Sequence, residues 1–243
     1  MKCVILAGGM ATRMRPFASY IPKHMIGICG KPLLEYTLYS LRKNGIREVC
    51  IVVGYQKEII MNYFRDGERF KMKISYFIQR ETLGTAHALR VAESFVADEE
   101  AFFLIYGDTF ISSKAILNMN EKYKETRASA ILALAAVKNP ERFGVAIIEN
   151  DRIKHIIEKP SLPPSNIVCA GAFILRPLVF EYIKKLAPSL RGEYELTEAI
   201  ENIINDDLPV YAVLIDDEDW AHIKTPSDLI KAQDIINKQF RCI

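Results

Sequence analysis

Residues 4–25 read VILAGGMATRMRPFASYIPKHM, and this stretch decides how the rest of the sequence is interpreted. An apolar run of strand character ends abruptly at Gly8 and Gly9, and the segment that follows carries Arg13 and Lys23 among turn residues. Glycines let backbone N–H groups approach an anion closely, and a guanidinium with an ammonium can neutralise several phosphate charges. The stretch therefore predicts a phosphate-binding loop directly after the first strand.

The spacing of this loop differs from that of the two commoner phosphate loops. The chain has no Gly-x-x-x-x-Gly-Lys-Ser/Thr sequence, and Gly8-Gly9 lacks the third glycine of a dinucleotide fingerprint. A glycine turn with two basic residues on the surface would explain the glycine pair alone. The presence of Arg13, Pro22 and Lys23 favours the phosphate site.

Composition narrows the class of protein. The 243 residues are half hydrophobic with a formal net charge of +2, which suits one α/β domain with a large core. No basic block is present, so we expect no nucleic-acid partner. The five cysteines form no C-x-x-C pair, which indicates reduced thiols. No apolar run reaches the roughly 18 residues of a membrane span and no leader is evident, so we expect no membrane partner and a cytoplasmic location.

Helix-length amphipathic patterns alternate with short Val/Ile-rich runs. Helices are expected at 32–44, 57–64 and 85–96, and strands at 3–7, 48–53, 73–79 and 101–106. This alternation predicts parallel strands with right-handed crossovers, which bind ligands at their carboxyl ends. Gly8, Gln79 and Asp108 each follow such a strand and should converge.

The second half of the chain is less regular and predicts a mixed region built onto the same sheet. Its expected helices are 113–124, 177–186, 196–205 and 226–237, and its expected strands are 128–137, 145–148, 153–158, 168–175 and 210–215.

Four further motifs follow the N-terminal stretch: QRETLGTAHA at 79–88, YGD at 106–108, FGV at 143–145 and EKP at 158–160. In this order the motifs resemble the signatures of the sugar-phosphate nucleotidyltransferases, the NDP-sugar pyrophosphorylases that include glucose-1-phosphate thymidylyltransferases and mannose-1-phosphate guanylyltransferases. Five motifs at family spacing are hard to obtain by chance. The resemblance implies an α/β, Rossmann-like nucleotide-diphospho-sugar transferase fold, with a central mixed, mostly parallel sheet flanked by helices.

The resemblance also implies the domain organisation and the reaction. We expect a single nucleotidyltransferase domain over 1–243, with a nucleotide-binding half at about 1–110, an acceptor-binding half at about 111–243 and no C-terminal β-helix domain. The expected reaction condenses a nucleoside triphosphate with a sugar 1-phosphate to give an NDP-sugar and pyrophosphate. The attacking phosphate is already anionic, so the protein must align two polyanions rather than supply a general base. Whether the chain forms a homo-oligomer is left open.

The family's functional residues map onto this chain as three sets. In the first set, Arg13 would stabilise the departing pyrophosphate, Lys23 the α-phosphate and Lys159 the attacking phosphate. The implied nucleotide-binding residues are Leu6, Ala7, Gly8, Gly9, Thr12, Arg13, Lys23, Gln79, Gly84 and Thr85. The implied sugar-phosphate-binding residues are Gly144, Glu158, Lys159 and Gly171.

The chemistry of these residue types agrees with the implied roles. The amide of Gln79 can both donate to and accept from a nucleobase edge. Gly144 would let a sugar ring approach the backbone, and Glu158 would accept hydrogen bonds from sugar hydroxyls. His87, within the second motif, is expected to pack or cap in its helix rather than act as a base.

The implied metal site departs from the family pattern. Asp108 ends an apolar strand and is the expected Mg²⁺ ligand, but His222 stands where the family has a second metal-binding aspartate and Lys224 where it has glycine. Imidazole is a poor ligand for magnesium and a good one for manganese, cobalt or zinc. We therefore expect Mg²⁺, or Mn²⁺ or another divalent metal, at Asp108 and His222. Ala11 and Cys169 replace a family glycine and asparagine.

Two other functions are left open. A non-catalytic paralog that binds a sugar nucleotide and regulates a partner would explain His222 and Ala11, but it has no need of the retained phosphate-binding residues. A nucleotidyltransferase with phosphocholine or another non-sugar phosphate as acceptor would keep the same reaction. The base and the sugar are not determined by these motifs.

Overall fold

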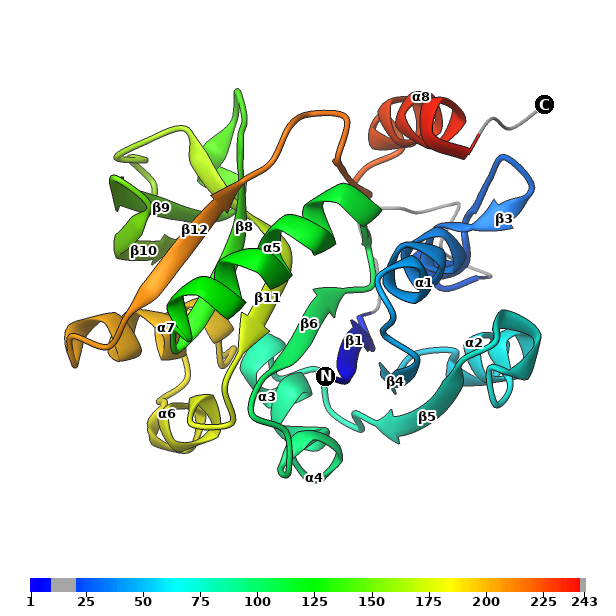
Figure 1. The fold of residues 1–243 in the computed structure, drawn as a ribbon, viewed down its shortest axis with the longest axis horizontal. Coiled ribbons are helices and arrows are strands. Elements are labelled where there is room, and N and C mark those ends of the chain that lie inside the picture. The colour runs from blue at the N-terminus through cyan, green and yellow to red at the C-terminus, as the bar shows by residue number, and fades with distance from the viewer. Residues whose placement is uncertain (10–20, 241–243) are drawn as a thin grey trace.

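The computed structural model describes residues 1–9 and 21–240. Within these residues the main sheet has nine strands, and helices pack on both of its faces (Figure 1). In sheet order the strands are β5 (Lys73–Ile78), β4 (Glu48–Val53), β1 (Cys3–Ala7), β6 (Phe102–Tyr106), β11 (Ile167–Leu175), β8 (Ala130–Ala136), β12 (Val210–Leu214), β10 (Arg152–Glu158) and β9 (Gly144–Glu149). The α/β fold with a central mixed sheet is confirmed.

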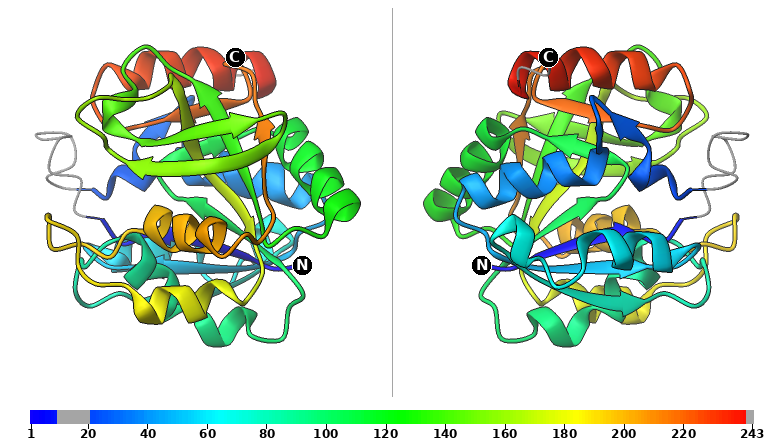
Figure 2. Two further views of the ribbon diagram at one scale, coloured as in Figure 1. Left: turned by 90° about the vertical axis from the view of Figure 1, so that its left-hand side faces the viewer. Right: turned by 90° about the vertical axis from the view of Figure 1, so that its right-hand side faces the viewer.

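The side chains of β1 alternate between two cores, because successive residues of a strand point to opposite faces. Cys3 and Ile5 pack with one core, and Val4 and Leu6 with the other. The first core is covered by α1 (Leu33–Lys43), α2 (Lys57–Phe64) and α5 (Ser113–Thr126). The second is covered by α3 (Thr85–Val91), α4 (Glu93–Val96), α6 (Val179–Lys185) and α7 (Leu196–Asn205). Figure 2 shows α6 (yellow) and α7 (orange) on the opposite side of the molecule from α8 (Asp228–Phe240, red).

The strand directions follow the pattern expected from the sequence. β1 pairs in parallel with β4 and β6, and β4 pairs in parallel with β5, so four consecutive crossover strands lie side by side. β11 runs antiparallel to β6 and attaches the mixed second half to the same sheet. The expected helix at 85–96 is two helices, because Ala92 adopts φ −97° and ψ 11° and its N–H donates to Leu89 O instead of continuing the α-helical pattern.

Two short ribbons were not predicted from the sequence. One pairs β7 (Thr109–Ile111) with β13 (Trp220–His222), so that His222 lies opposite Thr109. The other pairs β2 (Gly27–Ile28) with β3 (Lys31–Pro32) ahead of α1. The part of the chain that the structure describes also contains three 3-10 helices, η3 (Lys23–Met25), η4 (Glu68–Phe70) and η5 (Pro140–Arg142). Because β7 follows β6 directly, the first ribbon places β13 next to the segment that leaves the carboxyl end of β6.

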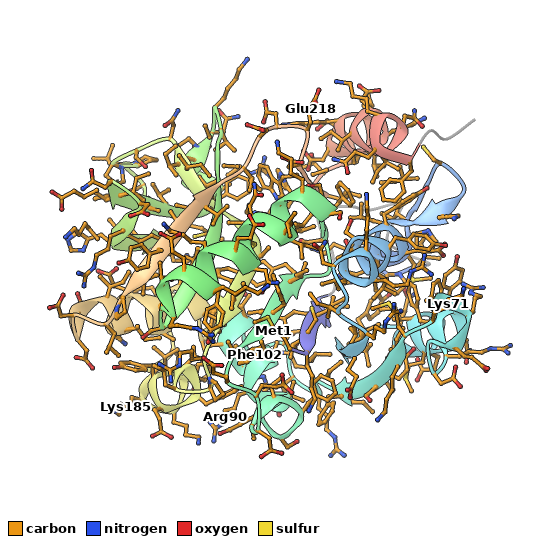
Figure 3. All side chains as sticks on the ribbon, viewed as in Figure 1. Met1, Lys71, Arg90, Phe102, Lys185 and Glu218 are labelled. Atoms are coloured by element: carbon orange, nitrogen blue, oxygen red, sulfur yellow. The ribbon has the colours of Figure 1, made fainter. Side chains whose placement is uncertain are left out.

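The surface is rich in charged side chains (Figure 3). Glu218, next to α8, accepts a hydrogen bond from Lys238 Nζ at 2.8 Å. Cys3, Cys50 and Cys169 are free thiols, Cys29 Sγ donates to Asn237 Oδ1 at 2.8 Å, and Cys242 lies outside the described residues. In the ranges 1–9 and 21–240, no helix is both long and apolar enough to cross a bilayer.

Candidate active site

The carboxyl ends of β5, β1 and β6 open onto a cavity of about 430 Å³, a size typical of small-molecule sites. Gly8 follows β1, Gln79 follows β5 and Asp108 follows β6, so these three residues converge as the sequence predicted. A Cβ on Gly8 would lie 2.7 Å from Gln79 Oε1, and one on Gly54 would lie 2.6 Å from Gly8 O. Gly54 therefore needs to be glycine for the two backbone segments to pack this closely, whereas a Cβ on Gly8 would displace the Gln79 amide.

The cavity brings together nearly all the site residues named from the sequence. Those that line it are Leu6, Gly8, Gly9, Lys23, Gln79, Gly84, Thr85, Asp108, Gly144, Glu158, Lys159, Gly171 and His222. Ala7 is fully buried in the core and does not line the cavity. Thr12 and Arg13, as well as Ala11, lie outside the described residues.

At one end of the cavity, the amide of Gln79 is held in a fixed orientation. Its Nε2 donates to Gly84 O at 3.3 Å and to His87 Nδ1 at 3.1 Å, and the side chain is only 6% exposed. Because the amide nitrogen only donates, His87 Nδ1 accepts and carries no proton. Both N–H groups of Gln79 are therefore used within the protein, and Oε1 is the atom next to Gly8.

Gly84, which precedes α3, has a conformation that only glycine adopts without strain. Its φ is +102°, and a Cβ there would come within 2.5 Å of Tyr194 O. Ala86 N donates to that same carbonyl at 2.9 Å, and Thr85 Oγ1 accepts from Leu196 N at 2.9 Å. These contacts fix the start of α3 against the segment that leads into α7.

At the centre of the cavity, Lys23 forms an ion pair with Asp108. Burial raises the pKa of Asp108, but the Lys23 ammonium outweighs this and holds the pKa below its ordinary value. The neighbouring His24 is buried, and burial lowers its pKa to about 3, so this imidazole is neutral. Its Nδ1 has no hydrogen-bond partner within the described residues. Asp108 is thus a carboxylate and His24 an uncharged ring.

The ribbon of β7 and β13 places His222 beside Asp108, because Ile223 N donates to Asp108 O at 2.8 Å. The His222 ring stacks on Trp220 with centroids 4.9 Å apart and meets Phe143 edge-on at 5.0 Å. Burial lowers the pKa of His222 to about 4, so the imidazole is neutral and can act as a ligand.

The donor set can be tested against a divalent cation. No group of three His, Cys, Asp or Glu residues arranged for a metal exists among residues 1–9 and 21–240. One carboxylate and one neutral imidazole could supply two ligands to a borderline divalent cation. Asp219 does not add to this set, because its carboxylate accepts from Ser112 Oγ at 2.6 Å, away from the cavity.

Lys224 enters the cavity from the loop after β13. Its Nζ donates to Arg142 O at 3.3 Å and lies 3.7 Å from the centroid of the Phe143 ring. Burial, opposed by the Asp108 carboxylate and assisted by the ammonium groups of Lys159 and Lys23, lowers the pKa of Lys224 to about 8.

At the other end of the cavity, Glu158 and Lys159 form the polar wall. Glu158 accepts a hydrogen bond from Thr197 Oγ1 at 2.8 Å and forms an ion pair with Lys159 Nζ at 2.8 Å. Gly144 lies opposite them, and a Cβ there would come within 2.8 Å of Thr197 Cγ2 and 3.1 Å of Glu158 Oε2. Gly171 has φ +77°, and a Cβ at this position would be in close contact with Thr109 and Tyr106. The missing Cβ at Gly144 therefore makes room for the side chains of Thr197 and Glu158.

Several residues of this wall were missed by sequence reasoning. Glu195 is only 3% exposed, and its carboxylate lies 2.5 Å from Arg191 Nη2 and 3.9 Å from Lys159 Nζ. Arg191 also lies 3.8 Å from Glu158. The segment RGEYELTEA at 191–199 combines a buried acid with an apolar helical pattern, which is the signal that could have identified it.

The comparisons with known proteins agree with this geometry. A family profile described as "Nucleotidyl transferase" matches residues 2–239. The low-salt glycan biosynthesis nucleotidyltransferase Agl11 of Haloferax volcanii is 33% identical over 97% of this chain and 66% of its own length. The UTP–glucose-1-phosphate uridylyltransferase AglF of the same organism is 36% identical over 89% of this chain and 88% of its own length. The chain spans about two thirds of the length of the first of these relatives.

Solved structures show the same fold. A structure of UDP-glucose pyrophosphorylase complexed with UDP-glucose superposes with a TM-score of 0.85 at 25% identity, covering 98% of both chains. A structure assigned to a glucose-1-phosphate thymidylyltransferase from Bacillus anthracis, in complex with sucrose, gives a TM-score of 0.87 at 30% identity, with 97% and 94% of the two chains covered. The cavity at the sheet's carboxyl edge, the order of the motifs and these matches lead to one conclusion: the chain belongs to the nucleotidyl transferase family.

Proposed function

We propose that this protein condenses a nucleoside triphosphate with a sugar 1-phosphate to give an NDP-sugar and pyrophosphate. The observation that carries the proposal is the single cavity in which Gly8 and Gln79 stand at one end, Lys23 and Asp108 at the centre, and Glu158 and Lys159 at the other end. Such an arrangement can hold two phosphate-bearing ligands in line. The named relatives that act on glucose 1-phosphate with UTP, or that form UDP-glucose, support it.

The reaction requires alignment and charge neutralisation. An oxygen of the sugar phosphate attacks the α-phosphorus, the bond from that phosphorus to the bridging β-oxygen breaks, and pyrophosphate leaves with the bonding electrons. No proton has to be removed from the attacking phosphate, so no general base is required. Lys23 would neutralise the α-phosphate and Lys159 the attacking phosphate, and Arg13, outside the described residues, would stabilise the departing pyrophosphate.

The ends of the cavity would select the two substrates. The backbone of Leu6–Gly9 with Gln79, Gly84 and Thr85 would hold the base, and Thr12 would complete this set. Gly144, Glu158 and Gly171 would hold the sugar. In this proposal the nucleotide-binding half spans about 1–110 and the acceptor-binding half about 111–243, within one domain.

Asp108 and His222 would hold the divalent cation that the family relationship implies, together with substrate phosphates. When bound, such a cation neutralises phosphate charge. A neutral imidazole favours Mn²⁺ or a similar metal over Mg²⁺. The protein's own contribution is to keep His222 unprotonated by burial between Trp220 and Phe143.

The test is pyrophosphate release from ATP, CTP, GTP, UTP and dTTP, each combined with glucose, mannose, galactose and N-acetylglucosamine 1-phosphates and with phosphocholine. Mg²⁺ and Mn²⁺ are used in parallel. We expect turnover with a sugar 1-phosphate, and we expect it to be lost in Lys23→Met and Lys159→Met while circular dichroism shows that both variants are folded. Turnover with phosphocholine and with none of the sugar 1-phosphates would show that the acceptor is phosphocholine and not a sugar phosphate. Binding of UDP-glucose without turnover in any combination would refute the enzyme and support a regulatory paralog.

A further inference from the structure

Three lysine ammonium groups line the cavity, and two of them already have carboxylate partners. Lys23 is paired with Asp108, and Lys159 Nζ lies 2.8 Å from Glu158. Lys224 differs, because across 1–9 and 21–240 no carboxylate oxygen lies within 4 Å of its Nζ. The two undescribed segments, 10–20 and 241–243, contain no Asp or Glu. Among the described residues, therefore, no acidic side chain forms an ion pair with this charge.

The position of Lys224 is fixed by its own backbone. Lys224 N donates to Asp228 Oδ2 at 2.8 Å, and Ile223 N donates to Asp108 O at 2.8 Å. The side chain then crosses the Phe143 ring, with Nζ 3.7 Å from the ring centroid and 3.3 Å from Arg142 O. An ammonium has three N–H donors, and one carbonyl and one ring face do not satisfy all of them. A half-buried charge of this kind is stabilised when an anion completes its partners.

The neighbours of Lys224 indicate which anion it would meet. Its Nζ contacts Arg142 and Phe143, and Phe143 O accepts from Lys159 N at 2.9 Å. The two lysines therefore flank the same short segment, which continues into Gly144 at the acceptor end of the cavity. Lys23, by contrast, lies beside Asp108 at the centre of the cavity.

We propose that Lys224 binds the phosphate of the acceptor, beside Lys159, as a second ammonium ligand of the attacking group. The proposal rests on the proposed function. The acceptor phosphate carries up to two negative charges and must approach a triphosphate, so a second fixed cation lowers the repulsion between them. Lys224 takes part in no proton transfer. It binds the oxygens that do not attack, while the new P–O bond forms at the α-phosphorus and pyrophosphate departs.

The test compares Lys224→Met, which removes the charge, with Lys224→Arg, which keeps it. Lys231→Met is the matched control, because Lys231 lies on α8, pairs with Asp217 at 3.2 Å and does not line the cavity. KM is measured separately for each substrate in the wild type's best pair. Loss of a charge-assisted hydrogen bond predicts a rise of about 10- to 100-fold in KM for the sugar 1-phosphate in Lys224→Met. The KM for the nucleotide should change by less than about threefold in Lys224→Met. For the sugar 1-phosphate, the KM of Lys224→Arg should lie between those of the wild type and Lys224→Met, and Lys231→Met should match the wild type.

A measurement that needs no turnover accompanies the kinetics. Calorimetry with glucose 1-phosphate and with UTP is expected to show weaker glucose 1-phosphate binding in Lys224→Met and unchanged UTP binding. Equal glucose 1-phosphate affinity in wild type and variant, or no affinity in either, overturns the proposal, as does a KM change confined to the nucleotide. A wild type that binds both ligands but releases no pyrophosphate refutes the proposed function and leaves the role of Lys224 standing. Melting temperatures confirm that every variant is folded.

Discussion

Replacing His87 with alanine tests whether this histidine orients the amide of Gln79. The hydrogen bond at 3.1 Å from Gln79 Nε2 would be lost, and one N–H of a side chain that is only 6% exposed would have no protein partner. An unsatisfied buried donor costs about 1–3 kcal/mol. His87 is half-buried, so water can enter part of the space, and we expect about 1–2 kcal/mol. The remaining bond to Gly84 O, at 3.3 Å, would hold the amide less firmly.

The assay is steady-state pyrophosphate release with the best nucleoside triphosphate and with the next best. A loss of about 1–2 kcal/mol corresponds to a fall of about 5- to 30-fold in kcat/KM. The fall should appear in KM for the nucleotide, because the base does not change between the ground state and the transition state. The ratio of kcat/KM between the two nucleotides should also decrease, since a freed amide can turn and present its N–H groups.

His87→Asn supplies the matched control, because an asparagine Oδ1 can lie near the position of the histidine Nδ1 and accept the same hydrogen bond. We expect this variant to retain most of the nucleotide preference. The reasoning is refuted if His87→Ala keeps the wild-type ratio between nucleotides. It is also refuted if His87→Asn is as impaired as His87→Ala, since packing and not the hydrogen bond would then be responsible.

Three other predictions concern stability and the metal. Gly84→Ala should lower the free energy of unfolding, measured by urea titration, by about 1–3 kcal/mol, because φ +102° and the contact with Tyr194 O both exclude a Cβ. The control is Gly27→Ala, which should lower it by less than about 1 kcal/mol because the space around Gly27 is open. The unfolding free energy should fall as pH decreases from about 6.5 towards 3, since His24 has a pKa of about 3 when folded and takes up its proton more readily when unfolded. The slope from this group is at most about 1.4 kcal/mol per pH unit, and a His24→Asn variant with an unchanged slope would contradict the assignment. His222→Asp should lower the Mg²⁺ concentration for half-maximal activity by about tenfold and reduce any preference for Mn²⁺, because a carboxylate is the harder ligand. If the wild type and the variant give identical metal titrations, His222 is not a metal ligand.

The parts of the site that the sequence predicted are those set by local patterns. Gly8, Gln79 and Asp108 each follow a strand, and parallel neighbours necessarily bring such positions to the same edge. The boundaries of β4, α2 and α7 also follow directly from their apolar periodicity and stop residues. Local chemistry is sufficient for these elements, because each is specified within a short window.

The parts that the sequence did not predict depend on pairing between distant segments. Trp220 pairs with Ile111, and no short-range pattern indicates this partner. Glu195 contacts Arg191, which lies on its own segment. Its other two partners, Thr85 and Lys159, come from segments that are distant in the sequence. Lys224 was recognised as a departure from the family pattern, while its contact with Phe143 became evident only in the structure. The roles of Thr12 and Arg13 stay predictions.

The place of β12 in the sheet has a consequence for the order in which the chain can fold during synthesis. β12 lies between β8 and β10, and Val210 pairs with Ala130. Until residues 210–214 leave the ribosome, the buried strand β8 has one edge without its neighbour, and the hairpin of β9 and β10 lacks the strand that joins it to β8. Unpaired apolar edges favour association with other chains. The first four parallel strands are complete early in the chain, but the acceptor end of the cavity is complete only when nearly the whole chain has been made, so β8 has an unpaired edge while residues 137–209 are translated.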